Sequence, residues 1–357
     1  MIEWRSFLET FIIGLVGVAV FSFTGIPLPW LIGSLVTVAT WSIITRRRLY
    51  WPLSFRQAAM ILLGYLIGTS FTKETIIEMG EHIPSMIAVT ALTIGFSLLL
   101  GYLFSRVTGL DLSSCLMGSI PGGLSQIMVL MDELKGVNPT VITFMQTMRV
   151  MVVVIAVPIL TVFIFPANQG KLIEAVTDSP GWLDMPWYAF LLYPLIMATG
   201  VWLFVRLNIP TAYLLGPMVF TIVLTLSGFT TPPLPGSFVE LSQILIGVHI
   251  GLQMNPRDLP GWKKTTSLTF GMIIVLVLFG FVLGYGLTSI YDLKLSTALL
   301  STAPGGMVEM GLTAVAVGGD VSVVTSYQLF RLLIVLFFVP LFFKWLINRK
   351  RTRRMDT

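Results

Sequence analysis

Long apolar runs recur along nearly the whole chain and are separated by short polar stretches. Runs of about 18 or more residues with few charges are typical of membrane-spanning helices. The pattern therefore predicts an all-α polytopic membrane protein. The runs cover residues 6–24, 27–45, 54–72, 83–107, 138–165, 185–206, 209–228, 237–254, 265–288 and 320–346.

Two apolar segments are interrupted by the same tripeptide. Pro121-Gly122-Gly123 lies within "GSIPGGLSQ" and Pro304-Gly305-Gly306 within "STAPGGMVE". Proline removes a backbone donor, and each glycine costs a helix about 1 kcal/mol relative to alanine. Each segment is therefore predicted to be broken or re-entrant.

The two interruptions belong to an internal duplication. A shift of 183 residues aligns the two Pro-Gly-Gly sites, and it also aligns the Gly64/Gly68 and Gly247/Gly251 pairs. The spacing of these glycine pairs predicts close helix packing. At a shift of 182, "TFMQTMRVMVVVIAVP" meets "TSYQLFRLLIVLFFVP" with identical Thr, Gln, Arg, Val and Pro positions. The predicted organisation is a membrane repeat at 1–165, a polar linker at 166–184, a second repeat at 185–346 and a basic cytoplasmic tail at 347–357.

Loop charges predict that the repeats have opposite orientations. The loop 46–56 holds four Lys or Arg residues and its counterpart 229–239 holds none, whereas 73–83 is acidic and its counterpart 255–264 is basic. Basic loops favour the cytoplasmic side. Two inverted repeats of about five transmembrane helices follow, with re-entrant Pro-Gly-Gly segments and with both termini at the cytoplasmic face of the cell membrane. A different merging of the first helices allows a broken spanning helix instead.

Composition and charge narrow the chemistry. The chain is 55% hydrophobic and only 11% charged, with a mean hydropathy of +0.89, against about 25% charged residues in soluble domains. The net charge of +5 is typical of membrane anchors, not of a nucleic-acid interface. Two histidines and one cysteine are too few for a metal oxygenase centre. We expect no enzymatic activity, no metal site and no cofactor beyond a coupling ion.

Matched interruptions in inverted repeats indicate a transporter binding site near the bilayer midplane. Arg149 and Arg331 lie about eleven residues into their spans, where a charge must face a cavity or the bundle interior. An alternative role for both arginines is to lock helices by bonding to carbonyls or to an acid. The candidate substrate- and ion-binding residues are Pro121, Gly122, Gly123, Gln126, Gln146, Arg149, Pro304, Gly305, Gly306, Glu309, Gln328 and Arg331.

Two arginines against one deeply placed glutamate leave the predicted site positive. Glu309 is able to hold a proton or to ligate Na⁺, with a salt bridge to Arg331 as its alternative role. The main hypothesis is a secondary transporter of a small anionic organic solute, coupled to H⁺ or Na⁺. A membrane sensor or regulator is the alternative. The expected partners are the solute and the lipid bilayer, with no nucleic acid; a homo-oligomer is left open.

The strings "GIPLPWLIGSL", "IPGGLSQ" and "APGGMVEM" carry a family resemblance. The chain resembles the AbrB-type duplicated membrane proteins, sometimes labelled ammonia monooxygenases, whose members are associated with control of gene expression. It is also similar to inverted-repeat carriers of the glutamate, citrate and bile-acid type. That similarity implies a substrate and ion site at both Pro-Gly-Gly segments, including Gln126 and Glu309. The oxygenase label does not fit the sparse metal ligands.

Overall fold

The computed structural model describes residues 2–47, 49–122, 137–164, 189–209, 211–229, 231–232, 234–253 and 262–337. All regular secondary structure in these ranges is helical, as predicted. The linker 166–184 and the tail 347–357 lie outside them. The helices are α1 Ile2–Ser22, α2 Pro29–Thr45, α3 Leu53–Thr69, α4 Lys73–Glu81, α5 Ile83–Thr108, α6 Leu112–Ser119, α8 Pro139–Ile164, α10 Ala189–Arg206, α11 Ala212–Leu226, α12 Gly236–Leu252, α13 Trp262–Ile290, α14 Leu295–Thr302, α15 Met307–Val317 and the unlabelled helix Val321–Phe337.

Four described helices are long and apolar enough to cross a membrane on their own. They are Trp4–Ser22 of α1, Ile83–Thr108, Pro139–Thr161 of α8 and Lys263–Ile290 of α13. The bent pair formed by α3 and α4 makes a fifth candidate. Six further apolar helical segments of the described residues, among them Leu192–Arg206 of α10, have 10–17 residues. The described residues thus fit a multi-pass helical membrane protein, and four or five of their helices are long enough to span a membrane, against the five per repeat expected for the whole chain.

One predicted loop is a helix. Residues 73–83 were expected to connect two spans, but Lys73–Glu81 form α4, which is bent by 86° from α3. The Thr72 side chain accepts a hydrogen bond from the Thr75 backbone, and the Thr75 hydroxyl accepts one from the Thr72 backbone. This reciprocal cap stabilises the helix start. It uses Thr where the usual motif has Glu or Gln, so the sequence signal is weak.

The first and second halves of the chain interlock through their shorter helices. Helix α2 packs on α12, and α3 packs on α11. A Cβ added to Gly64 would lie 2.4 Å from the Leu214 carbonyl oxygen, and one added to Gly247 would lie 2.5 Å from that of Leu31. The backbones of the two helix pairs therefore touch. The predicted close packing at the glycine pairs is confirmed at equivalent positions of both repeats.

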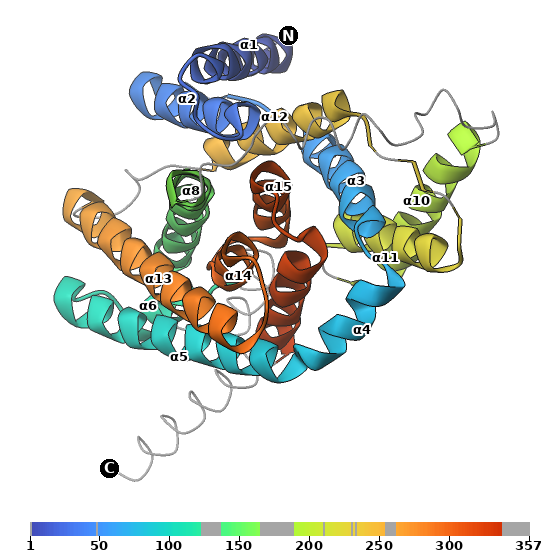
Figure 1. Cartoon of the computed structure of the whole chain (residues 1–357). Helices are drawn as coiled ribbons and strands as arrows, with labels where there is room; N and C mark the ends of the chain where they lie inside the picture. Colours follow the sequence, from blue (N-terminus) through green and yellow to red (C-terminus); the bar gives the residue numbers. More distant parts are fainter. Residues whose placement is uncertain are drawn as a thin grey trace.

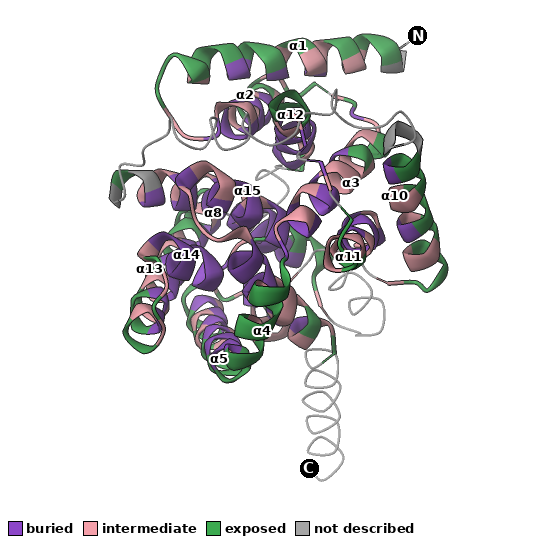
Figure 2. Cartoon of the chain, turned by 45° about the vertical axis from the view of Figure 1, so that its right-hand side comes forward, coloured by how far each residue is buried: buried purple, intermediate pink, exposed green. Residues whose placement is uncertain are grey.

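The remaining helices surround the interrupted segments. In Figure 1, α14 and α15 lie in the middle of the molecule, with α8, α13 and α5 to one side and α3 and α11 to the other. Figure 2 shows α14 and α15 as largely buried, whereas α1 and α10 turn exposed faces outward. Helix α15 also contacts α3, and α12 contacts α8. The interlocked helices thus contact the second interrupted segment through α15, and they also contact α8.

Exposed apolar side chains cover the outer faces of the long helices. Leu99 on α5 is 51% exposed and Val282 on α13 is 67% exposed, and α10 presents Leu195 at 64%. Contiguous apolar surface of this kind marks contact with lipid or with another protein. Because α5 and α13 are long enough to span a membrane, their exposed apolar faces fit contact with lipid.

Candidate functional site

Each Pro-Gly-Gly segment follows a short half-helix. Helix α14 ends at Thr302, residues 303–306 form a bent, non-helical connection, and α15 starts at Met307. In the first repeat α6 ends at Ser119, and Pro121 and Gly122 continue the chain. Gly123 and Gln126 lie outside the described residues. The predicted helix interruption is therefore present at both sites.

The two ends of each segment lie side by side. The backbone N–H of Asp320, after α15, donates to the Thr297 hydroxyl near the start of α14 at 2.9 Å. In the first repeat the backbone N–H of Asn138 donates to the Ser114 hydroxyl at 2.7 Å. Each segment therefore leaves near the point where it began. We call α14, residues 303–306 and α15 the second hairpin, and α6 with residues 120–122, the described part of the equivalent segment, the first hairpin.

A glutamine and an arginine bind the tip of the second hairpin. Gln328 Nε2 donates to the carbonyls of Leu300 at 2.9 Å and Ala303 at 3.1 Å. Arg331 Nη1 donates to Ala303 O at 2.8 Å, and Nη2 donates to Gly305 O. The last carbonyls of a helix have no partner within that helix. These two side chains supply donors that the broken backbone lacks.

The first hairpin is held in the same way. Gln146 Nε2 donates to the carbonyls of Met117 and Ile120, both at 3.0 Å. Arg149 Nη1 donates to Ile120 O at 2.6 Å, and Nη2 donates to Gly122 O at 2.8 Å. The helix-locking role considered for the arginines therefore describes their hydrogen bonds. Both guanidinium groups nevertheless bring positive charge to the tips.

The side-chain oxygens of the two glutamines differ in their partners. Gln328 Oε1 accepts from Arg331 Nη2, whereas Gln146 Oε1 is buried and has no hydrogen-bond partner. Buried polar atoms without a partner are uncommon in folded proteins. The first hairpin thus keeps one unused acceptor beside its arginine.

Glu309 lies beside the exposed part of the second hairpin. It is the third residue of α15, and its Oε2 lies 2.1 Å from where a Cβ on Gly306 would be. The carboxylate therefore folds back over the start of the helix, where backbone N–H groups and the helix dipole favour negative charge. Gly306 is exposed, and Gly305 and Glu309 are half-buried. Glu309 forms no ion pair within 4.0 Å of a described residue, so its alternative salt bridge with Arg331 is absent.

Two further charged groups face this carboxylate. Arg56, in the first turn of α3, and Arg149 both interact electrostatically with Glu309. Arg56 also interacts with His249 of α12, whose Nε2 lies 2.9 Å from Gln253 Nε2. Arg149 and Arg331 interact with each other across the two repeats. Glu309 thus lies within electrostatic range of Arg56 and Arg149, and Arg149 lies within that of Arg331; we take these three arginines and the glutamate as the candidate site.

Sequence reasoning missed Arg56 and His249 as site residues. Arg56 was counted with the basic loop 46–56, and His249 was not among the candidate binding residues. One signal for Arg56 was available, because Pro52 directly before an apolar run favours a helix start at Leu53 and so places Arg56 inside the helix. Nothing in the sequence links α3 or α12 to the second hairpin.

A buried polar cluster supports the helix that carries Gln328 and Arg331. His82, between α4 and α5, places Nδ1 3.1 Å from the Tyr327 hydroxyl, and the Ser85 hydroxyl lies 2.6 Å from the same oxygen. Burial lowers the pKa of His82, opposed by the charges of Glu78 and Glu81. His82 is therefore favoured in its neutral form beside Tyr327.

Comparisons with known proteins identify the family. The model of the family described as "Transition state regulatory protein AbrB" matches residues 3–347. The chain is 25% identical over 346 residues to "Uncharacterized protein YhjN" of Bacillus subtilis (strain 168), covering 92% of this chain and 89% of that protein. It is 26% identical over 289 residues to "Putative regulator AbrB" of Escherichia coli (strain K12), covering 81% and 82%. The chain belongs to the AbrB family, as its motifs predicted.

Proposed function

We propose that this AbrB-family membrane protein is a secondary transporter of a small organic anion, coupled to H⁺ or Na⁺. One observation carries the proposal. Arg149 and Arg331 each bind the backbone of one interrupted segment and interact electrostatically with each other, and Arg149 also interacts with Glu309, which follows the exposed Gly306. Irregular backbone at membrane depth is tolerated where it is buried in protein or lines a watery cavity.

The hairpin geometry supports inverted, re-entrant segments. Each hairpin begins and ends on one side, and Arg149 interacts with Arg331 near both tips. Hairpins that enter from opposite faces would meet in this way near the midplane, which is where inverted-repeat carriers bind their substrates. The proposed topology has ten crossings and places both termini in the cytoplasm of the cell.

The charge arrangement supports an anionic solute. Arg56, Arg149 and Arg331 outnumber Glu309 in the described site, and the hydrogen bonds of Arg149 and Arg331 leave their positive charge in place. A solute carboxylate would be drawn to this region, and its binding would compete with Glu309 for the start of α15. A proton or a Na⁺ ion on Glu309 relieves that competition, which couples ion and solute. We propose no catalytic role for any of these residues.

A sensor or regulator is the second candidate. The name of the Escherichia coli relative, "Putative regulator AbrB", favours it. A sensor with this fold would bind its ligand at the same charged site without moving it across the membrane. Binding alone therefore does not separate the two functions, whereas flux does.

Solute flux in proteoliposomes is the decisive test. A panel of small carboxylates would be offered with an imposed proton or sodium gradient, using wild type, Glu309→Gln and Glu240→Gln. Glu240 is an exposed carboxylate on α12 and serves as the matched control. We expect gradient-driven accumulation in wild type and in Glu240→Gln. Glu309→Gln should lose accumulation while still exchanging labelled solute.

Two outcomes would overturn parts of this proposal. Equal accumulation by Glu309→Gln and wild type would remove Glu309 from the coupling step. Ligand binding without flux, from folded and inserted protein, would favour the sensor.

Topology is tested separately with single cysteines in a Cys115→Ala background. We expect an impermeant maleimide outside intact cells to label Asp292→Cys and not Val107→Cys, both of which are exposed positions. Labelling of both or of neither contradicts the inverted arrangement.

A further inference from the structure

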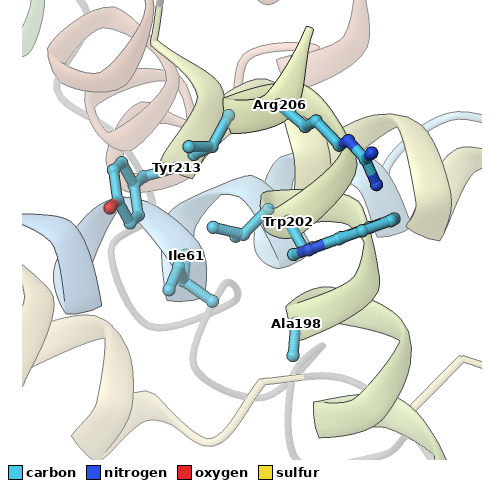
Figure 3. A pocket seen from close by; sticks show the side chains of 7 residues that line it. Ile61, Ala198, Trp202, Arg206 and Tyr213 are labelled. Carbon is cyan, nitrogen blue, oxygen red and sulfur yellow. The ribbon is translucent and has the colours of Figure 1, made fainter. Parts of the chain in front are cut away.

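An elongated groove opens on the outer face of the second repeat, away from the charged site. It lies between α10, α3 and α11, encloses about 540 Å³ and is lined mainly by apolar side chains, with Ile61 of α3 at its base. Figure 3 shows Trp202 and Arg206 along one wall and Tyr213 on the other. Its volume is in the range of pockets that bind small organic ligands.

The groove is amphipathic along its length. Ala198 and Trp202 lie deeper along α10, whereas Arg206 is the last residue of that helix. The Arg206 guanidinium carbon lies 5.3 Å from the centre of the Trp202 ring, which fixes the charge over the groove. Trp and Arg at a helix end are typical of the membrane–water interface. The groove thus has an apolar body and one cationic end.

The first repeat has no counterpart of the Trp202–Arg206 pair. Under the 183-residue shift, Trp202 corresponds to Ala19 of α1 and Arg206 to Phe23 directly after it, although both α1 and α10 pack on the following helix. Helix packing is therefore satisfied without the Trp–Arg pair in the first repeat. The pair marks a property found only on the second repeat.

We propose that this groove binds an anionic phospholipid, with its phosphate at Arg206 and an acyl chain along Trp202 and Ile61. Charge complementarity selects the lipid headgroup, because basic pockets between transmembrane helices favour anionic lipids. The apolar walls match an acyl chain and not a free phosphate. In the proposed topology Arg206 lies at the cytoplasmic side. The lipid site itself is independent of the proposed transport function.

A matched control exists on α5. Arg106 lies 5.3 Å from the ring centre of Tyr102 with the same four-residue spacing, and its Nε donates to the Tyr102 hydroxyl at 3.1 Å. This pair is exposed at the end of a long helix, and neither residue lines the groove. Arg106→Gln therefore removes an equivalent surface charge without touching the groove.

The test is native mass spectrometry of the full chain in detergent, titrated with phosphatidylglycerol or phosphatidylcholine. We expect wild type, Arg106→Gln and Arg206→Lys to retain phosphatidylglycerol in preference to phosphatidylcholine. Arg206→Gln should weaken phosphatidylglycerol binding about fivefold. Trp202→Leu should weaken the binding of both lipids. Inorganic phosphate alone should neither bind nor displace the lipid.

Three results would overturn the proposal. Equal phosphatidylglycerol retention by Arg206→Gln and wild type would remove the headgroup site. Displacement of the lipid by inorganic phosphate would make the site a free-anion site. Loss of a dimer in Arg206→Gln and Trp202→Leu, with lipid counts unchanged, would instead assign the groove to contact between two copies of the chain.

Discussion

The packing of α3 on α11 gives a prediction whose size follows from the structure. Replacing Gly64 with alanine would place a Cβ 2.4 Å from the Leu214 carbonyl oxygen and 3.3 Å from the Met218 backbone nitrogen. Both neighbours are backbone atoms of a helix, so neither can rotate away as a side chain would. The two helices would have to separate by about 1 Å to restore ordinary contact.

Separation of these helices should lower the free energy of unfolding. Overpacking in a tight core costs about 1–3 kcal/mol. Alanine also gains about 1 kcal/mol of helix propensity over glycine, which offsets part of the loss. Gly95→Ala on α5 isolates this gain, because a Cβ there meets nothing within 4 Å. The difference between the two variants should therefore equal the overpacking term of about 1–3 kcal/mol.

Reversible denaturation of purified protein in mixed micelles measures this difference. We expect Gly64→Ala to unfold at lower denaturant than Gly95→Ala. Gly247→Ala, which meets the Leu31 carbonyl at 2.5 Å, should behave like Gly64→Ala. Equal unfolding midpoints for Gly64→Ala and Gly95→Ala would refute the close approach of the α3 and α11 backbones.

Three further changes test other contacts. Tyr65→Phe removes a buried 2.6 Å hydrogen bond to the Pro232 carbonyl and should cost about 1–3 kcal/mol in the same denaturation assay; no loss would contradict the bond. Gln328→Leu should destabilise more than Gln146→Leu, because only Gln328 Oε1 accepts from an arginine; the reverse order contradicts this asymmetry. Since burial lowers the pKa of His82, the folded protein binds fewer protons there than the unfolded chain, whose histidine titrates near about 6.5. The free energy of unfolding should be highest above that pH and should fall as the pH drops through it. His82→Gln should lose this pH dependence in thermal-unfolding scans from pH 8 to 5.

The internal repeat made the fold partly readable from sequence. Gly64 and Gly247 occupy equivalent positions, and a glycine that recurs in a duplicated apolar segment indicates close backbone contact. The Pro-Gly-Gly motifs likewise fixed where the helices break, because proline and glycine act through local backbone geometry. Local rules and repetition therefore located the interruptions and the packing surfaces.

Contacts between segments far apart in the sequence could not be predicted from local patterns. Arg56 reaches Glu309 only because α3 packs beside α15, and no local pattern encodes that pairing. The arginines were predicted as bundle-facing charges, but their pairing with the hairpin carbonyls depends on where α8 and Val321–Phe337 lie. The apolar runs at 27–45, 54–72, 209–228 and 237–254 did predict α2, α3, α11 and α12, although each of these helices is a few residues shorter than its run or starts or ends beside it.

The charge of Glu309, on the second hairpin, bears directly on the coupling of ion and solute. With Glu309 ionised, the three arginines leave a net charge of +2 at the described site; with Glu309 protonated, the net charge is +3. A proton on Glu309 therefore strengthens the attraction for an anionic solute, and by reciprocity the bound anion favours the proton. Under the proposed transport function, solute affinity should rise as the pH falls, and binding should take up a proton. Glu309→Gln holds this position neutral at all pH values, so its solute affinity should match low-pH wild type and lose its pH dependence, measured by calorimetry in buffers of different ionisation enthalpy. A pH-dependent affinity that survives in Glu309→Gln would place the coupling group elsewhere.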